Sequence, residues 1–328
     1  MRLIKRFFII VLLIAGLLAG AMGFYATRSL TLPTLPFEFS INQGSSLKGA
    51  ARQMQQAGVF SNARMFVLLG RVLGKTSQIK AGNYELENAP TPLKLLEMMT
   101  SGSVSQNELT IIDGWTFSQL RDYLNTDTAI LHDSAALSET DILQRLGASE
   151  THAEGLFFPD TYYFANGTSD LSLLKRAYRN MQKHLLENWQ TRVAGLPIES
   201  PYQALILASL VEKETGQAKD RGLIAGVFIN RLHKGMLLQT DPTVIYGMGT
   251  KYAGKLHKYD LQLDTPYNTY TRAGLTPTPI ALPGLAALQA ALHPAQTDAL
   301  YFVARGDGSS EFSGTLAQHN RAVNRYQK

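Results

Sequence analysis

Two glutamates at the end of an apolar segment are the residues of this 328-residue chain best suited to acid–base chemistry. Residues 204–215 read ALILASLVEKET, which predicts a buried helix whose polar side chains come only in its last turn. Residues two apart on a helix differ by about 200°, so Glu212 and Glu214 cannot face the same cleft. Glu214 continues the apolar stripe of Leu207 and Leu210, whereas Glu212 lies on a face of smaller residues.

This location favours a carboxylic acid that carries a proton near neutral pH. Burial against an apolar stripe disfavours the charged form, and the carbonyl end of the helix acts in the same direction. Together they raise the pKa of a glutamate from about 4.3 towards about 6, as a general acid requires. The alternative, from geometry alone, is that Glu212 and Glu214 are surface residues paired with Lys213 or Lys219.

Other short patterns do not support a nucleotide-binding site, the active site of a penicillin-binding enzyme or a metal site. Gly70 and Gly74 have three residues between them, where a phosphate-binding loop needs four after a strand. Ser172-Leu-Leu-Lys175 matches S-x-x-K but lacks the motifs that accompany it. The histidines do not share a helical turn, there is no H-E-x-x-H, and there are no cysteines, so we predict no metal and no cofactor.

The charge of the chain argues against nucleic acid as a partner. The formal net charge is +5, but Arg2, Lys5 and Arg6 supply three of these charges, which leaves +2 for the rest of the chain. The composition, 45% hydrophobic and 17% charged, is that of an ordinary folded protein.

An apolar run from Phe7 to Tyr25 follows these basic residues and is long enough to cross a membrane as a helix. Basic residues before it indicate that residues 1–6 are a cytoplasmic tail. We therefore predict a transmembrane anchor at residues 7–25, with the rest of the chain outside the cytoplasm. The alternative is a cleaved signal peptide, because Ala19-Gly20-Ala21 resembles a cleavage site.

A linker with two prolines, at residues 26–36, precedes a small module at residues 37–109. Phe37–Ile41 and Tyr84–Leu86 suit short strands, and two amphipathic segments between them suit helices. The strand–helix–helix–strand (βααβ) order is that of LysM-type glycan-binding modules.

Residues 110–328 are predicted to form one larger domain of mixed strands and helices, a size that a single core supports. Strands are expected at 109–112 and 300–304, and helices at 172–188, 202–215, 221–234, 285–292 and 316–326. The predicted fold class is therefore α+β: a transmembrane helix, a LysM-like module and a catalytic domain whose helix 202–215 carries Glu214.

Seven stretches resemble the YceG-like endolytic murein transglycosylases. They are Glu154–Tyr162, Val211–Thr215, Val227–Arg231, Leu238–Gly247, Tyr267–Tyr270, Tyr301–Val303 and His319-Asn320. The stretch LQTDPTVIYG, residues 238–247, makes the likeness highly specific. Glu214-Thr215 and Gly235–Gln239 also resemble the Glu-Ser and Gly-Leu-Met-Gln signatures of lytic transglycosylases and goose-type lysozymes.

The resemblance implies an endolytic peptidoglycan lytic transglycosylase. Such an enzyme cleaves the β-1,4 bond between N-acetylmuramic acid (MurNAc) and N-acetylglucosamine (GlcNAc) in nascent strands, leaves 1,6-anhydro-MurNAc ends and terminates glycan elongation. The implied partners are peptidoglycan glycan strands, cell-wall synthases and the cell inner membrane, bound through the N-terminal helix, with the catalytic domain in the periplasm.

The resemblance also assigns site residues. It places the catalytic glutamate at Glu214, on a helix like that of lysozymes. The implied substrate-binding residues are Gln239, Asp241, Tyr267, Asn268 and Tyr270, with Glu154 and Asp160 as further candidates.

Two positions depart from the family pattern. Gly274–Gly284 reads GLTPTPIALPG, with Leu282 where the family has an asparagine, and Glu311 stands where the family usually has a histidine. Three alternatives stay open from the residues: hydrolysis with Asp241 as second carboxylate, a glycan-binding protein without activity, and a membrane-tethered scaffold.

Overall fold

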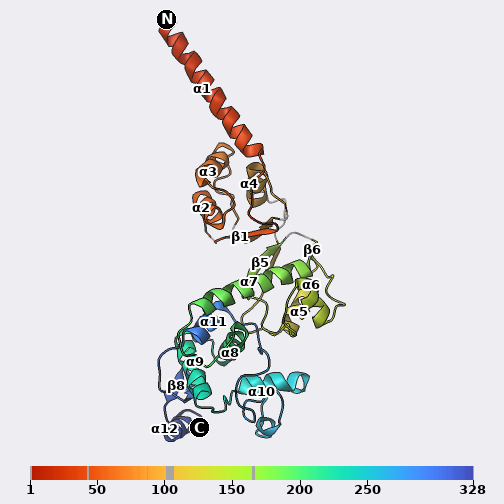
Figure 1. Cartoon of the computed structure of the whole chain (residues 1–328), viewed down its shortest axis with the longest axis vertical. Coiled ribbons are helices and arrows are strands. Elements are labelled where there is room, and N and C mark those ends of the chain that lie inside the picture. Colours follow the sequence, from red (N-terminus) through yellow and green to blue (C-terminus); the bar gives the residue numbers. More distant parts are fainter. Residues whose placement is uncertain are drawn as a thin grey trace. The chain divides into compact units, whose positions relative to one another are not determined.

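The computed structural model divides the chain into two units, whose elements are labelled in Figure 1. The N-terminal unit consists of residues 1–109 with 161–166, and the C-terminal unit of residues 110–160 with 167–328. The structure describes residues 2–42, 44–80, 82–86, 88–100, 107–164 and 167–327. Within these ranges, the side chains of residues 2–11, 15, 38, 40, 82, 83 and 85 lie outside the description.

A pair of antiparallel strands brackets the first module of the N-terminal unit. β1 (Phe37–Ile41) pairs with β2 (Gly82–Leu86). Between them in the sequence come α2 (Leu47–Ala57) and α3 (Ala63–Val72), and α4 (Pro92–Thr100) follows. This order confirms the predicted strand–helix–helix–strand arrangement, whereas the likeness to LysM modules stays a prediction.

The spacing of apolar residues explains how α2 packs. Its buried residues include Leu47 and Met54, seven positions apart and therefore on one face of the helix. The hydroxyl of Ser46 accepts a hydrogen bond from the backbone N–H of Gly49 at 3.2 Å, which caps the first turn. Gly58, with φ of 91°, ends the helix in the left-handed conformation that glycine adopts easily.

The helix at the N-terminus ends against this module. α1 (Arg2–Thr27) contributes Met22 and Tyr25, which pack on the apolar core of the N-terminal unit. Leu30 and Leu32, in the predicted linker, also pack on that core, because burying them removes apolar surface from water. These residues therefore contribute to the N-terminal unit.

Within the part of the chain that the structure describes, no helix combines the length and the apolar character that a membrane crossing requires. The anchor predicted at residues 7–25 includes residues 7–11 and 15, whose side chains lie outside the description. The helix itself is confirmed by α1, and the membrane crossing is not confirmed.

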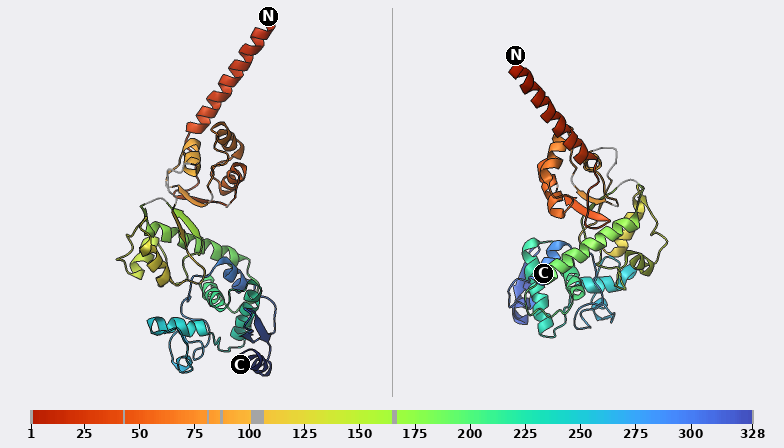
Figure 2. Two further views of the ribbon diagram at one scale, coloured as in Figure 1. Left: turned by 180° about the vertical axis from the view of Figure 1, so that it is seen from behind. Right: turned by 45° about the horizontal axis from the view of Figure 1, so that its top comes forward.

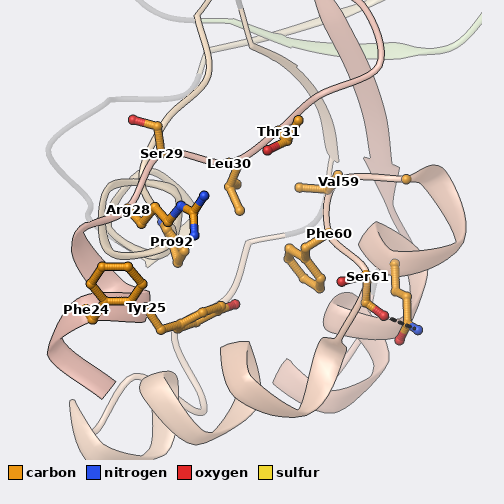
Figure 3. Close-up of a pocket in the computed structure, with 12 residues that line it drawn as sticks. Phe24, Tyr25, Arg28, Ser29, Leu30, Thr31, Val59, Phe60, Ser61 and Pro92 are labelled. Atoms are coloured by element: carbon orange, nitrogen blue, oxygen red, sulfur yellow. Dashed lines mark hydrogen bonds between the residues drawn. The ribbon is translucent and has the colours of Figure 1, made fainter. Parts of the chain in front are cut away.

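The N-terminal unit holds a cavity of about 700 Å³ beside the last turn of α1 (Figure 3). Phe24, Arg28 and Phe60 are among its lining residues. The dashed line in the figure joins Gln55 Nε2 to the carbonyl of Ser61 at 2.9 Å. None of the described residues that line it is a carboxylate.

Helices dominate the C-terminal unit. They are α5 (Phe117–Thr126), α6 (Glu139–Leu146), α7 (Asp170–Gln190), α8 (Pro201–Glu214), α9 (Ala218–His233), α10 (Asp241–Met248), α11 (Leu285–Leu292) and α12 (Leu316–Tyr326). Two short 3₁₀ helices follow α10, η1 (Gly249–Lys251) and η2 (Asp260–Gln262). The expected helices at 285–292 and 316–326 are confirmed to the residue, and those at 172–188, 202–215 and 221–234 within three residues at each end.

The remaining strands are short and form further two-stranded sheets. They pair as β3 (Asn107–Thr110) with β5 (Thr161–Phe164), β4 (Ile130–Leu131) with β6 (Thr168–Ser169), and β7 (Tyr301–Ala304) with β8 (Ser310–Ser313). The β4–β6 pair is parallel and the β7–β8 pair antiparallel. The mixture of helices with small sheets confirms the predicted α+β class.

The core of the C-terminal unit surrounds α8. Residues 204–211 of this helix are all buried, because α7, α9 and α11 pack around it (Figures 1 and 2). Ser200 caps the first turn by accepting from the N–H of Gln203 at 3.2 Å, and Pro201 occupies the first helical position. The buried helix predicted from the apolar run is confirmed.

The sequence analysis did not predict α10, the helix that begins beside Glu214. Its eight residues contain β-branched residues and a glycine and show no apolar period. Pro242 in the first turn, after Thr240 at the N-cap, is the local signal for a helix start.

Candidate active site

The carboxyl group of Glu214 lies at the C-terminal end of α8, where the buried helix reaches a cavity. Thr240 donates its hydroxyl proton to Oε1 of Glu214. Burial raises the pKa of Glu214 to about 7; the Thr240 hydrogen bond opposes this shift and the negative charge of Asp241 adds to it. Glu214 is therefore an acid that can both give and take a proton near neutral pH.

The cavity that Glu214 enters has a volume of about 530 Å³. Its walls come from the ends of α8 and α9, the start of α10, the β7–β8 hairpin and α12. Of the predicted site residues, the structure brings four together here: Glu214, Gln239, Asp241 and Tyr270.

Glu212 faces elsewhere, as helix geometry predicts for a residue two positions away. Its Oε2 accepts from the N–H of Gly284 at 3.0 Å, and its Oε1 lies 4.0 Å from Arg221 Nη2. Burial raises the pKa of Glu212 as well. Its carboxyl is occupied by these partners and does not line the Glu214 cavity.

Asp241 opens α10 beside Glu214. Its Oδ1 accepts from the hydroxyl of Tyr270 at 2.5 Å. Burial raises the pKa of Tyr270, and the hydrogen bond to Asp241 adds to the shift, so this phenol stays protonated at neutral pH. The two side chains form a fixed polar pair in the cavity wall.

Gln239 has a strained backbone. Its φ of 52° lies in the left-handed region, which non-glycine residues rarely adopt. Its N–H donates to the carbonyl of Thr269 at 3.1 Å, and its Oε1 accepts from Arg231 Nη1 at 3.2 Å. Strain maintained in this way is typical of functional sites.

Arg231, on α9, holds the segment before α10 in place. Its Nη1 donates to the carbonyls of Leu237 at 3.0 Å and Leu238 at 2.9 Å, and its Nε donates to that of Leu300 at 2.6 Å. The guanidinium carbon lies 5.1 Å from the ring centre of Tyr301. One buried cation thus connects the Gln239 segment with β7.

Asn268 and Tyr267 do not line the Glu214 cavity. Asn268 is fully buried; its amide donates to the carbonyl of Leu263 at 2.7 Å and accepts from the N–H of Tyr270 at 2.8 Å. The Tyr267 hydroxyl is 2.9 Å from that of Thr278. Asn268 therefore shapes the turn that carries Tyr270.

Glu154 lies in a different cavity, of about 330 Å³. Its carboxylate accepts from the N–H of Phe117 at 2.9 Å and from the hydroxyl of Tyr246 at 3.1 Å. Burial raises the pKa of Glu154 to about 7. Asp160, the other further candidate, is exposed and lines neither cavity; its carbonyl accepts from the N–H of Ile111 at 3.0 Å.

The two departures from the family pattern have structural explanations. Leu282 is fully buried, and its backbone exchanges hydrogen bonds with Trp115 at 2.7 Å and Gly114 at 2.8 Å. Glu311 pairs with Arg305 across the β7–β8 hairpin, with 2.9 Å between Oε2 and Nε.

Sequence reasoning missed four residues of this cavity and its surroundings: Thr240, Arg231, Tyr301 and His319. All four lie in the stretches that resemble the family, and that was the signal that could have found them. No cluster of three histidine, aspartate or glutamate side chains suited to a metal occurs among the residues described.

The chain is similar to several known proteins along most of its length. A model of the YceG-like family matches residues 39–325. An endolytic murein transglycosylase of Bacillus subtilis is 32% identical over 312 residues, which cover 88% of this chain and 84% of that protein. One from Streptococcus pneumoniae is 28% identical over 359 residues, covering 96% of this chain and 64% of that longer protein. The crystal structure of a yceG-like protein from Listeria monocytogenes is 30% identical, covers 87% of this chain and 98% of its own, and has a TM-score of 0.53.

Proposed function

The chain belongs to the YceG-like family, and on this premise we propose that Glu214 is the acid and base of a peptidoglycan-cleaving lytic transglycosylase. At the level of reaction class, the chain is a lytic transglycosylase that acts on peptidoglycan. The observation that supports the role of Glu214 is its carboxyl group, which meets a cavity and has a pKa raised to about 7.

The bond cleaved is the β-1,4 linkage between MurNAc and GlcNAc. Glu214 donates its proton to the glycosidic oxygen as the bond from MurNAc C1 to that oxygen breaks. The resulting carboxylate then accepts the proton of the MurNAc C6 hydroxyl, whose oxygen bonds to C1 and closes a 1,6-anhydro ring. One carboxyl group suffices, because the nucleophile belongs to the substrate and Glu214 ends the cycle protonated.

Three residues of the same cavity bind the strand. Gln239, Asp241 and Tyr270 line it beside Glu214 and present an amide, a carboxylate and a phenol. Asn268 acts through Tyr270, since it holds the backbone of that residue. Substrate contacts at Tyr267, Glu154 and Asp160 stay predictions.

The cleavage takes place outside the cytoplasm, where peptidoglycan lies. Residues 7–25 anchor the chain in the inner membrane; the apolar run and the basic residues before it support this assignment. An anchored enzyme meets strands as the synthases make them, and cleavage within those strands terminates their elongation.

The test replaces Glu214 by Gln in the full-length chain and measures cleavage of purified glycan strands by mass spectrometry. The amide cannot donate a proton as an acid, so cleavage should fall at least about a thousandfold. Glu212→Gln is the matched control, because its carboxyl binds Gly284 outside the cavity; it should keep activity within about threefold. Products of the parent chain should lack one water relative to hydrolysis products. Retained cleavage in the Glu214 variant would exclude its assigned role.

A further inference from the structure

The wall of the Glu214 cavity that α12 provides is built from one face of that helix. The lining residues on α12 are Leu316, His319 and Val323, which recur every three or four positions, and Gln327, the C-cap residue, follows them. Side chains with this spacing share a face of a helix. The cavity wall at α12 is thus continuous along the helix.

His319 is the ionisable residue on this face, and its surroundings keep it uncharged. The imidazole stacks on the ring of Tyr301, with 5.2 Å between ring centres and 24° between planes. Burial lowers the pKa of His319, and the charge of Arg231 lowers it further, so the ring is neutral at pH 7. A neutral imidazole recognises uncharged polar groups.

The orientation of the imidazole leaves one nitrogen for a ligand. Nδ1 is enclosed and has no hydrogen-bond partner among the residues that the structure describes. Nε2 is therefore the ring atom left to meet a molecule in the cavity that His319 lines.

The remaining lining favours a neutral ligand. Asp241 would repel an anion, and Arg231, the one cation among the described lining residues, already donates Nε and Nη1 to backbone carbonyls and to Gln239. Tyr270, Tyr301 and Phe302 add aromatic surface. Aromatic walls with a few placed polar groups suit the hydroxyl and acetamido groups of a glycan.

We propose that His319 is a substrate-binding residue that hydrogen-bonds through Nε2 to a hydroxyl or acetamido group of the glycan strand, on the wall formed by α12 and β7. Tyr301 holds the imidazole ring in place. Arg231 is a positioning residue, because it contacts both Tyr301 and the Gln239 segment on the other side of the cavity. This inference rests on the proposed function, since it takes glycan strands as the ligand.

The test measures binding of purified, uncross-linked glycan strands to the full-length Glu214→Gln chain by calorimetry. In that background, His319→Phe keeps an aromatic ring against Tyr301 but removes both nitrogens. The loss of one neutral hydrogen bond should weaken binding roughly three- to tenfold. His319→Gln, whose amide nitrogen replaces Nε2, should bind within about threefold of the parent.

The control is Asn324→Ala, on an exposed part of α12 that does not line the cavity; it should leave binding unchanged. In the otherwise unaltered chain, His319→Phe should raise KM by the same factor and leave kcat within about threefold. Equal affinity of the His319→Phe and parent chains would overturn the proposal.

The two assignments fail separately. If Glu214→Gln still cleaves strands, the role of Glu214 is wrong, and the KM of the single His319 variants still decides the inference. If Glu214→Gln is inactive while His319→Phe binds normally, only the inference is wrong.

Discussion

At the scale of the residue, Glu214 combines burial with access to a cavity. Its carboxyl loses solvation at the end of a buried helix, and the hydroxyl of Thr240 donates a hydrogen bond to its Oε1. Because desolvation raises the pKa of Glu214 to about 7, this carboxyl can give and take a proton near neutral pH, as its proposed role requires.

The pH dependence of cleavage follows from this pKa. Since protonated Glu214 must donate first, kcat/KM should fall roughly tenfold per pH unit above about pH 7, where the carboxyl is ionised. Initial rates on glycan strands between pH 5 and 9, about two units either side of this pKa, would measure the descending limb of the pH profile.

Glu154 provides the control, because its pKa is also raised to about 7 but it lies in the other cavity. The descending limb should keep its position in Glu154→Gln. A limb that disappears in this variant would assign the ionisation to Glu154 instead.

The left-handed backbone at Gln239 predicts that two variants lose activity alike but differ in stability. Gln239→Gly and Gln239→Ala both remove the amide that meets Arg231, so both should lower kcat/KM at least about tenfold. Only glycine relieves the strain at φ of 52°, so the glycine variant should be more stable than the alanine variant by about 1 kcal/mol. Urea unfolding measures the difference; an alanine variant of equal or greater stability would contradict the strain.

At the scale of the element, α8 positions more than the acid at its end. Ser209, fully buried, donates to the carbonyl of Ile206 at 2.7 Å and accepts from the N–H of Ile280 at 3.0 Å. This ties the loop at residues 274–284 to the helix. Pro279, in that loop, packs closely on Gly155. A Cβ atom on residue 155 would lie 2.5 Å from the Cβ of Pro279, so only glycine fits there.

Loss of the hydrogen bond between the Ser209 hydroxyl and the N–H of Ile280 should destabilise the C-terminal unit. Ser209→Ala leaves the buried N–H of Ile280 without a partner, which costs about 1–3 kcal/mol in free energy of unfolding. Ser172→Ala, at an exposed position of α7, should change stability by less than about 0.5 kcal/mol. Urea titration of both variants gives the comparison, and equal midpoints would show that the contact does not stabilise the fold.

At the scale of the whole molecule, the proposed membrane anchor and the proposed active site belong to different units. The proposed anchor belongs to the N-terminal unit, and every residue that lines the Glu214 cavity belongs to the C-terminal unit. Each unit has its own buried apolar residues, so a change confined to the start of α1 need not disturb the site.

Removal of residues 1–20 tests this separation. The deletion keeps Met22 and Tyr25, which pack on the core of the N-terminal unit. The shortened chain should move from the membrane fraction to the soluble fraction, because the apolar run that would hold it is gone. Its kcat on soluble glycan strands should stay within about threefold of the full-length value. A shortened chain that still sediments with membranes would contradict the anchor.

Local patterns were sufficient to predict most of the longer helices and to propose Glu214 as the acid, but not to predict α10. An apolar run with polar residues only at its end identified α8, and the angle between residues two apart separated Glu214 from Glu212. The local sequence pattern also located the helices at 285–292 and 316–326. These features depend on neighbours in the chain, so the sequence alone determines them.

Tertiary structure alone decided which side chains share the cavity. Thr240 and His319 reach Glu214's surroundings from segments far along the chain, and Glu154, in a stretch that resembles the family, lies in a separate cavity. The raised pKa values of Glu214 and Glu154 likewise come from packing by distant elements. Such contacts depend on how helices pack around α8, and no local spacing encodes that arrangement.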